Sequence, residues 1–121
     1  MLDKPKHVFW LGNSREVLRE FPESVRESIG YALYVAQRGD KHPSAKPLKG
    51  FGGTGVLEVV EAFDGDTYRA VYTVRYANSV YVLHAFKKKS KSGITTPKHE
   101  IDLIRERLRW AERHFARSEN E

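Results

Sequence analysis

The sequence contains no cysteine and only one methionine among its 121 residues. Neither a disulfide nor a thiolate metal site can therefore form, which is consistent with a reducing compartment. The apolar run at 8–11 is too short for the core of a secretion signal, and no stretch approaches the ~20 apolar residues of a membrane span. We therefore expect a soluble, cytoplasmic protein with no membrane partner.

Acidic residues are the minority charge, with 16 aspartates and glutamates against 21 lysines and arginines, which gives a net charge of +5 at pH 7. This excess is a mild bias toward polyanions, and its distribution along the chain is more informative than its size. The length predicts one domain, which we place at residues 1–117, followed by a polar tail at 118–121.

The N-terminal third predicts one strand and two helices. An apolar β-type run at 8–11 ends in a turn signal, and Asn13 with Glu16 forms a capping-box pattern for a short helix. A second helix begins at residue 23, because apolar residues then recur at spacings of three and four until the Arg-Gly-Asp stop at 38–40. The two helices are expected to pack as an antiparallel hairpin.

The remaining two thirds predict a meander followed by a helix. Residues 39–55 hold five of the nine glycines and have no helical or strand period, so they form a long connection. Three β-type runs follow, at 56–63, 67–75 and 79–86. Thr96 is expected to cap a last helix whose first residue is Pro97.

The element order β-α-α-β-β-β-α predicts an α+β fold: a single domain with an antiparallel-rich sheet, the helical hairpin on one face and a C-terminal helix. The other face of the sheet is then available for a ligand. Side chains alternate along the run at 67–75, and Tyr68 and Tyr72 belong to its apolar side. The alternation therefore directs Arg69 and Arg75 toward the open face.

One segment concentrates positive charge. Residues 87–99 contain no carboxylate, and Lys87, Lys88, Lys89 and Lys91 follow one another where a strand end meets a loop and a helix N-terminus. Such a place suits a phosphate-bearing ligand. Crowding of like charges also lowers lysine pKa values, so that one lysine could accept a proton. A solvated lysine turn is the alternative interpretation.

A glycine motif and the histidines give weaker signals. Residues 50–55 match G-x-G-x-x-G, but the dinucleotide fingerprint needs a helix after it and here a strand follows, which favours a flexible loop. The five histidines show no metal-ligand spacing, so we expect no metal and no cofactor. His84, within a strand, favours a satisfied histidine over a catalytic one. His99 lies in the first turn of the last helix, beside the lysines. This position is equally consistent with a functional histidine and with one that is merely exposed.

Residues of the type of Arg69 and the lysines are enough to cleave RNA, because the 2′-hydroxyl of the RNA itself supplies the nucleophile. The arginine would hold a phosphoryl oxygen as negative charge develops, and a lysine of lowered pKa would move a proton. Lysine-rich loops bind phosphates more often than they act on them. The residues alone therefore favour passive phosphate binding over catalysis.

Three motifs together resemble a known family: Tyr-Arg-Ala-Val-Tyr at 68–72, Val-Leu-His-Ala-Phe-Lys-Lys-Lys-Ser at 82–90 and Thr-Pro-Lys-His-Glu-Ile at 96–101. They are similar to the phage-related, HigB-like (Gp49-like) branch of the RelE/ParE toxin superfamily, and the element order matches its RelE-like fold. The resemblance implies the toxin of a type II toxin–antitoxin system, a ribosome-dependent and metal-independent mRNA endoribonuclease. It also implies a helix-turn-helix (HigA-like) antitoxin encoded by an adjacent gene as partner, with mRNA and the ribosome as targets.

Carried over by position, the resemblance implies roles for Arg69, for the lysines at 87–89 and 91, and for Lys46 and Lys49, while the other candidates come from the residues themselves. The expected catalytic residues are Arg69, Lys87, Lys89, His99 and Glu61, with the identity of the base left open among His99, Glu61 and a lysine. The expected RNA-binding residues are Lys46, Lys49, Arg75, Lys88, Lys91 and Lys98.

The second predicted strand departs from the family pattern. Relatives often place lysine or arginine there, whereas this chain has Glu58 and Glu61. A carboxylate then serves either as the base or as a salt-bridge partner of Arg69. Two other functions stay open: inhibition of DNA gyrase in the manner of ParE, and RNA binding without catalysis.

Overall fold

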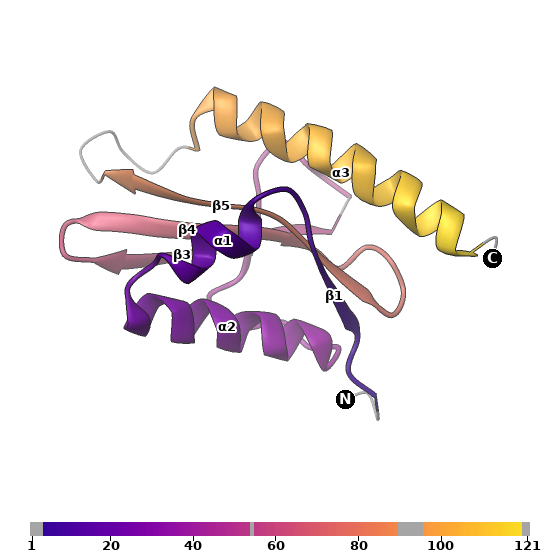
Figure 1. Cartoon of the computed structure of the whole chain (residues 1–121), viewed down its shortest axis with the longest axis horizontal. Helices are drawn as coiled ribbons and strands as arrows, with labels where there is room; N and C mark the ends of the chain where they lie inside the picture. The colour runs from indigo at the N-terminus through magenta and orange to yellow at the C-terminus, as the bar shows by residue number, and fades with distance from the viewer. Residues whose placement is uncertain (1–3, 54, 90–95, 120–121) are drawn as a thin grey trace.

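A five-stranded sheet with helices on both faces forms the protein (Figure 1). The computed structural model describes residues 4–53, 55–89 and 96–119. In these ranges the strands are β1 (His7–Trp10), β2 (Lys46–Pro47), β3 (Val56–Phe63), β4 (Asp66–Thr73) and β5 (Ser79–Lys89), and the helices are α1 (Ser14–Arg19), α2 (Glu23–Gln37) and α3 (Lys98–Glu119). The predicted α+β class and the order of its elements are confirmed, with one additional short strand, β2.

The strands lie in the order β1-β5-β4-β3-β2, with β1 parallel to β5 and every other pair antiparallel. The ladder between β4 and β5 shifts once: Val71 lies opposite His84, and Tyr72 lies opposite Val82. Leu83 is therefore an extra residue on β5, as in a β-bulge. The bulge breaks the alternation of β5 and lets Leu83 and His84 share one face.

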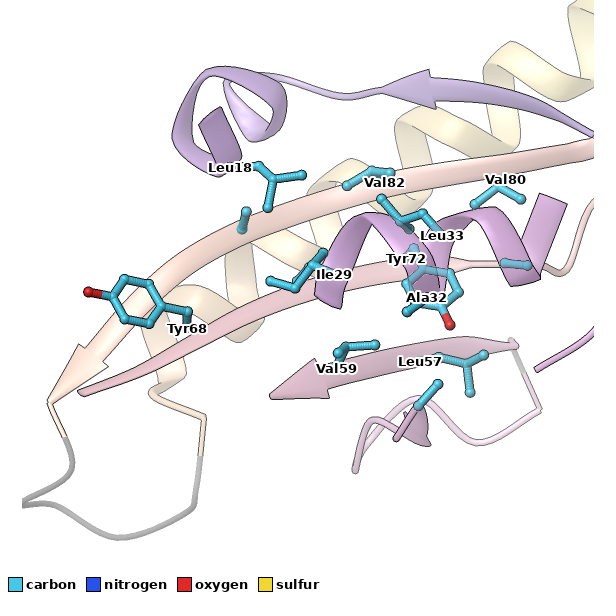
Figure 2. Close-up of a cluster of buried hydrophobic side chains, with 14 of the residues drawn as sticks. Leu18, Ile29, Ala32, Leu33, Leu57, Val59, Tyr68, Tyr72, Val80 and Val82 are labelled. Atoms are coloured by element: carbon cyan, nitrogen blue, oxygen red, sulfur yellow. The ribbon is translucent and has the colours of Figure 1, made fainter. Parts of the chain in front are cut away.

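The helical hairpin α1–α2 covers one face of the sheet (Figure 2). The apolar period predicted for α2 places its buried residues against the strands, and Ile29 is fully buried. Figure 2 shows Leu18, Ile29, Leu33, Tyr72 and Val82 in this layer. Tyr68 and Tyr72 face the hairpin, as the alternation of β4 predicts.

The opposite face is only partly open, because α3 packs across it (Figure 1). Ile104 and Ala111 of α3 are fully buried in a second core with Leu83 and Tyr81 of β5. The expectation that this whole face is available for a ligand is therefore wrong: α3 buries its apolar stripe on it. A large hollow is left over β2, β3 and β4.

Two strand boundaries differ from the prediction. The strand predicted at 67–75 ends at Thr73, so the alternation that placed Arg75 on the open face stops before that residue. The strand predicted at 79–86 continues to Lys89, because Lys87, Lys88 and Lys89 pair with β4. Three lysines that were expected at a strand end and in a loop therefore belong to the sheet.

Helix ends also differ in detail. Asn13 stands at the N-cap position of α1, but it makes no side-chain cap hydrogen bond, and its Oδ1 instead accepts from Nη2 of Arg107 at 3.0 Å. The last helix begins at Lys98, one residue later than predicted, and continues to Glu119, into the segment expected to be a polar tail. In the described part of the chain, none of the helices is long and apolar enough to cross a bilayer.

Candidate active site

A cleft of about 740 Å³ opens where β2, β3 and β4 meet the N-terminal end of α3. It forms because α3 covers the β5 side of the sheet and leaves the β2 side uncovered. Its lining residues are Ser44, Lys46, Pro47, Leu48, Lys49, Glu58, Val60, Arg69, Thr96 and Ile101. Segments far apart in sequence thus bring cations, one carboxylate and two hydroxyls to the same hollow.

Arg69 and Glu58 form an ion pair in this cleft. Nη1 of Arg69 lies 3.5 Å from Oε2 of Glu58, and the side chains are only 4% and 14% exposed. The pair is diagonal across the ladder, since Val60 lies opposite Arg69 and Val71 lies opposite Glu58. Burial makes each charge depend on the other for compensation.

Thr96 joins the pair from the segment before α3. Its Oγ1 donates a hydrogen bond to Oε2 of Glu58 at 3.1 Å and accepts one from Nη1 of Arg69 at 3.4 Å. All contacts of the Glu58 carboxylate within the described residues use Oε2. Oε1 is therefore available to accept a proton or a hydrogen bond from a molecule in the cleft.

Two lysines stand at the rim of the cleft. Lys46 lies directly opposite Glu58 in the β2–β3 ladder, and Lys49 follows β2; both side chains are exposed. The rim is thus positive, while the floor holds a nearly neutral arginine–glutamate pair. Such a distribution of charge favours a polyanion at the rim.

The lysine run alternates between the two faces of the sheet, because it lies in β5. Lys88 is buried on the face of Arg69, where Oγ1 of Thr67 donates to the Lys88 carbonyl oxygen. Lys87 and Lys89 point toward the other face. Nζ of Lys87 lies 3.2 Å from Oδ2 of Asp66 and 5.8 Å from the centre of the Tyr68 ring.

This environment raises the pKa of Lys87, through the hydrogen bond and charge of Asp66 and then through Tyr68. The direction is opposite to the lowering that a crowded lysine run predicts. Lys87 is therefore a poor candidate for a neutral proton acceptor, and it is removed from the lysines considered as the base.

The other predicted residues lie outside the cleft. Glu61 follows Leu57 and Val59 on the helical-hairpin face of β3, opposite to the face of Glu58. Arg75 is exposed beyond β4, with its guanidinium 5.9 Å from the centre of the Tyr76 ring. Lys98 pairs with Asp102 at 2.8 Å on the surface of α3, and the His99 side chain is 80% exposed. Lys91 lies outside the described residues.

His84 belongs to a second polar cluster under α3. It is 6% exposed; its Nδ1 lies 3.1 Å from Nη1 of Arg107, and its Nε2 lies 2.9 Å from Oε1 of Glu100. A guanidinium can only donate, so Nδ1 must accept and Nε2 must carry the proton that bonds Glu100. The sequence-based interpretation of a satisfied, buried histidine is therefore confirmed.

Burial lowers the pKa of His84, and Arg107 and His99 act in the same direction, while Glu100 opposes them. The folded-state pKa is thus below the value of 6.5 for an unperturbed histidine, so the unfolded state binds more protons as the pH falls through this range. The stability that neutral His84 contributes is complete above about pH 6.5 and is lost as the pH decreases.

We expect NMR of the imidazole nitrogens to show the Nε2–H tautomer at pH 7 and a titration midpoint below 6.5. The difference in unfolding free energy between the wild type and His84→Gln should also shrink from pH 7 to pH 5, because Gln cannot titrate. A midpoint above 6.5 would contradict the assignment, since it would mean that the charged form is favoured in the fold.

Sequence reasoning found Arg69, Lys46 and Lys49 but missed Thr96 as a cleft residue. The Thr-Pro pattern indicated a helix cap, and the hydroxyl instead contacts Glu58. The sequence did contain one signal for Glu58: it is a carboxylate on the second predicted strand (β3), where relatives often have lysine or arginine. Within the described residues, no group of three or more histidines, cysteines, aspartates or glutamates is placed to hold a metal ion.

The fold is RelE-like. A mutant of the Escherichia coli toxin RelE in the free state matches it with a TM-score of 0.51 at 17% identity, over 74% of this chain and 87% of that chain. The toxin–antitoxin complex RelBE2 from Mycobacterium tuberculosis gives a TM-score of 0.43 at 17% identity, over 72% of this chain and 95% of that chain. No curated protein gives a significant sequence match.

The family model described as "Phage derived protein Gp49-like (DUF891)" matches residues 16–109. The chain therefore belongs to the phage-derived Gp49-like family, and its fold is RelE-like. The resemblance inferred from the three sequence motifs is confirmed at this level.

Proposed function

We propose that this protein is the toxin of a type II toxin–antitoxin pair and that it cleaves mRNA on the translating ribosome. The observation that carries the proposal is the buried Arg69–Glu58 pair on the floor of a cleft whose rim is lined by lysines. Membership of the Gp49-like family and the RelE-like fold support the same class of protein.

The proposed reaction is an internal transesterification. Oε1 of Glu58 takes the proton of the RNA 2′-hydroxyl, and the 2′-oxygen forms a bond to the adjacent phosphorus while the bond from phosphorus to the 5′-oxygen breaks. Arg69 is close enough to the carboxylate to stabilise the charge that develops on the phosphoryl oxygens. The leaving 5′-oxygen receives a proton from water, which yields a 2′,3′-cyclic phosphate and a 5′-hydroxyl.

Each group in this scheme is placed by a different element. Thr96 fixes the orientation of the Glu58 carboxylate, and Lys46 and Lys49 bind the backbone on either side of the scissile phosphate. The scheme needs no metal, because Arg69 and the rim lysines supply the positive charge. A helix-turn-helix antitoxin from an adjacent gene is the proposed partner, and the cytoplasm the proposed location.

Mapping of RNA 5′ ends in cells that express the chain tests the proposal. New ends with a 5′-hydroxyl, positioned relative to codons, are expected with the wild type. The Lys46→Ala/Lys49→Ala variant should reduce them roughly tenfold, because two phosphate contacts are lost. Arg15→Ala/Arg26→Ala is the matched control, since it removes the same charge from exposed positions on α1 and α2.

Two results would overturn the assignment. Growth arrest with a DNA-damage response and intact mRNA would identify gyrase as the target. RNA binding without new 5′ ends, and without growth arrest, would leave a non-catalytic RNA-binding protein.

A further inference from the structure

Four arginines form a stripe on the outward side of α3. They recur at every fourth position, which advances about 6 Å along the helix axis at each step, and all four are exposed. The stripe consists of Arg105, Arg109, Arg113 and Arg117. Since four residues rotate about 40° beyond one full helical turn, the stripe crosses the outer side of α3 obliquely instead of facing the sheet.

The stripe is not neutralised by carboxylates of its own helix. Glu106 and Glu112 lie beside it, but within the described residues neither forms an ion pair with any of the arginines. Arg105 is held by the glycine loop, where its Nη2 donates to the Gly50 carbonyl at 3.2 Å and its guanidinium lies 4.5 Å from the centre of the Phe51 ring. Positive charge therefore extends from the loop beside the cleft across α3.

An exposed tryptophan lies beside the middle of the stripe, between Arg109 and Arg113 in the sequence. Trp110 is 42% exposed, and one face of its ring stacks on His114, with the ring centres 5.1 Å apart and the planes 11° apart. His114 is fixed in turn by a 2.8 Å hydrogen bond between its Nδ1 and the hydroxyl of the buried Tyr81. The indole is thus held in place while part of its surface is open to solvent.

A hollow of about 340 Å³ adjoins this tryptophan. It lies between the chain at 10–12 and α3, and its α3 lining comprises Glu106, Arg107, Trp110 and Arg113. Arg107 is occupied by the Leu83 carbonyl, His84 and Asn13, so Arg113 is the cation that can contact a ligand there. The hollow therefore combines an aromatic surface with a guanidinium from the stripe.

We propose that this outer side of α3 is a second RNA-binding surface, distinct from the cleft. The arginines of the stripe would contact successive phosphates of a single strand, and an unstacked base would stack on Trp110 over the hollow. The choice of RNA over other polyanions rests on the proposed function. Regular arginine spacing together with a braced aromatic ring favours a nucleic-acid strand over an acidic polypeptide, which offers no planar base to stack.

Fluorescence anisotropy with a labelled 2′-O-methyl RNA oligonucleotide tests this surface in the full chain. The oligonucleotide cannot be cleaved by attack of a 2′-hydroxyl, so binding is measured apart from catalysis. Arg109→Gln/Arg113→Gln/Arg117→Gln should reduce the slope of log K against log salt concentration by about 2, from three lost contacts at roughly 0.7 each. Trp110→Ala should weaken binding about tenfold.

The matched control is Arg15→Gln/Arg19→Gln/Arg26→Gln, which removes three exposed arginines from α1 and α2. Equal effects of the two triple variants would overturn the proposal, because only net charge would then matter. If polyglutamate displaces the oligonucleotide equally well from the wild type and from Trp110→Ala, the proposal is also overturned, in favour of an acidic protein partner. If the wild type cleaves no mRNA in cells while stripe-dependent binding persists, the proposed reaction fails and this surface is supported.

Discussion

Glu58→Gln is expected to reduce RNA cleavage by a factor on the order of 10²–10⁴, the usual contribution of a general base. The amide keeps the shape of the carboxylate and an oxygen that can accept from Thr96, but it cannot take a proton at neutral pH. The cleft should therefore stay assembled while the proton transfer is lost.

Single-turnover cleavage of ribosome-bound mRNA measures this effect. Glu61→Gln is a matched comparison, because it makes the same chemical change three residues later on the same strand, on the opposite face of the sheet. A large loss with Glu61→Gln and none with Glu58→Gln would reverse the roles that the structure supports. Thermal unfolding of both variants checks that any loss of activity is not a loss of fold.

Much of the fold follows from local patterns in the sequence. The apolar spacing of α2 and the stripe of α3 gave the correct elements, because a helix buries one side whatever its partners are. The strand at 56–63 was predicted with its observed bounds, since turn signals flank it. The short strand β2 was missed, because two residues carry no period and its pairing with Leu57 and Glu58 is a tertiary contact.

The candidate site was less predictable, because a residue belongs to the cleft only if its side chain lies on the correct face of the sheet. Alternation correctly separated Arg69 from Tyr68. The lysines at 87–89 were predicted at a strand end and in a loop, but they belong to β5. They were therefore expected at one place, whereas the sheet directs them to two faces. Neither the bulge at Leu83 nor the contact of Thr96 with Glu58 has a local signature, since both depend on how distant elements pack.

Arg69→Ala is expected to destabilise the protein by about 3–5 kcal/mol, because it leaves the Glu58 carboxylate without its charge partner in a largely buried position. The double variant Arg69→Met/Glu58→Leu should recover most of this loss, and it could exceed the wild type in stability, since buried ion pairs are often replaceable by apolar side chains of similar volume. Chemical denaturation of the single and double variants completes a double-mutant cycle and gives the coupling energy of the pair.

The same cycle separates a structural from a functional reason for keeping the pair. If the double variant is as stable as the wild type but produces no new mRNA 5′ ends, stability alone does not require a charged pair in the cleft, and its retention is explained by chemistry on RNA. A double variant that is much less stable than the wild type would instead make the pair a structural necessity of the sheet. In that case Glu58→Gln becomes the decisive measurement, because it removes the proposed base while keeping an oxygen that can accept hydrogen bonds from Arg69 and Thr96.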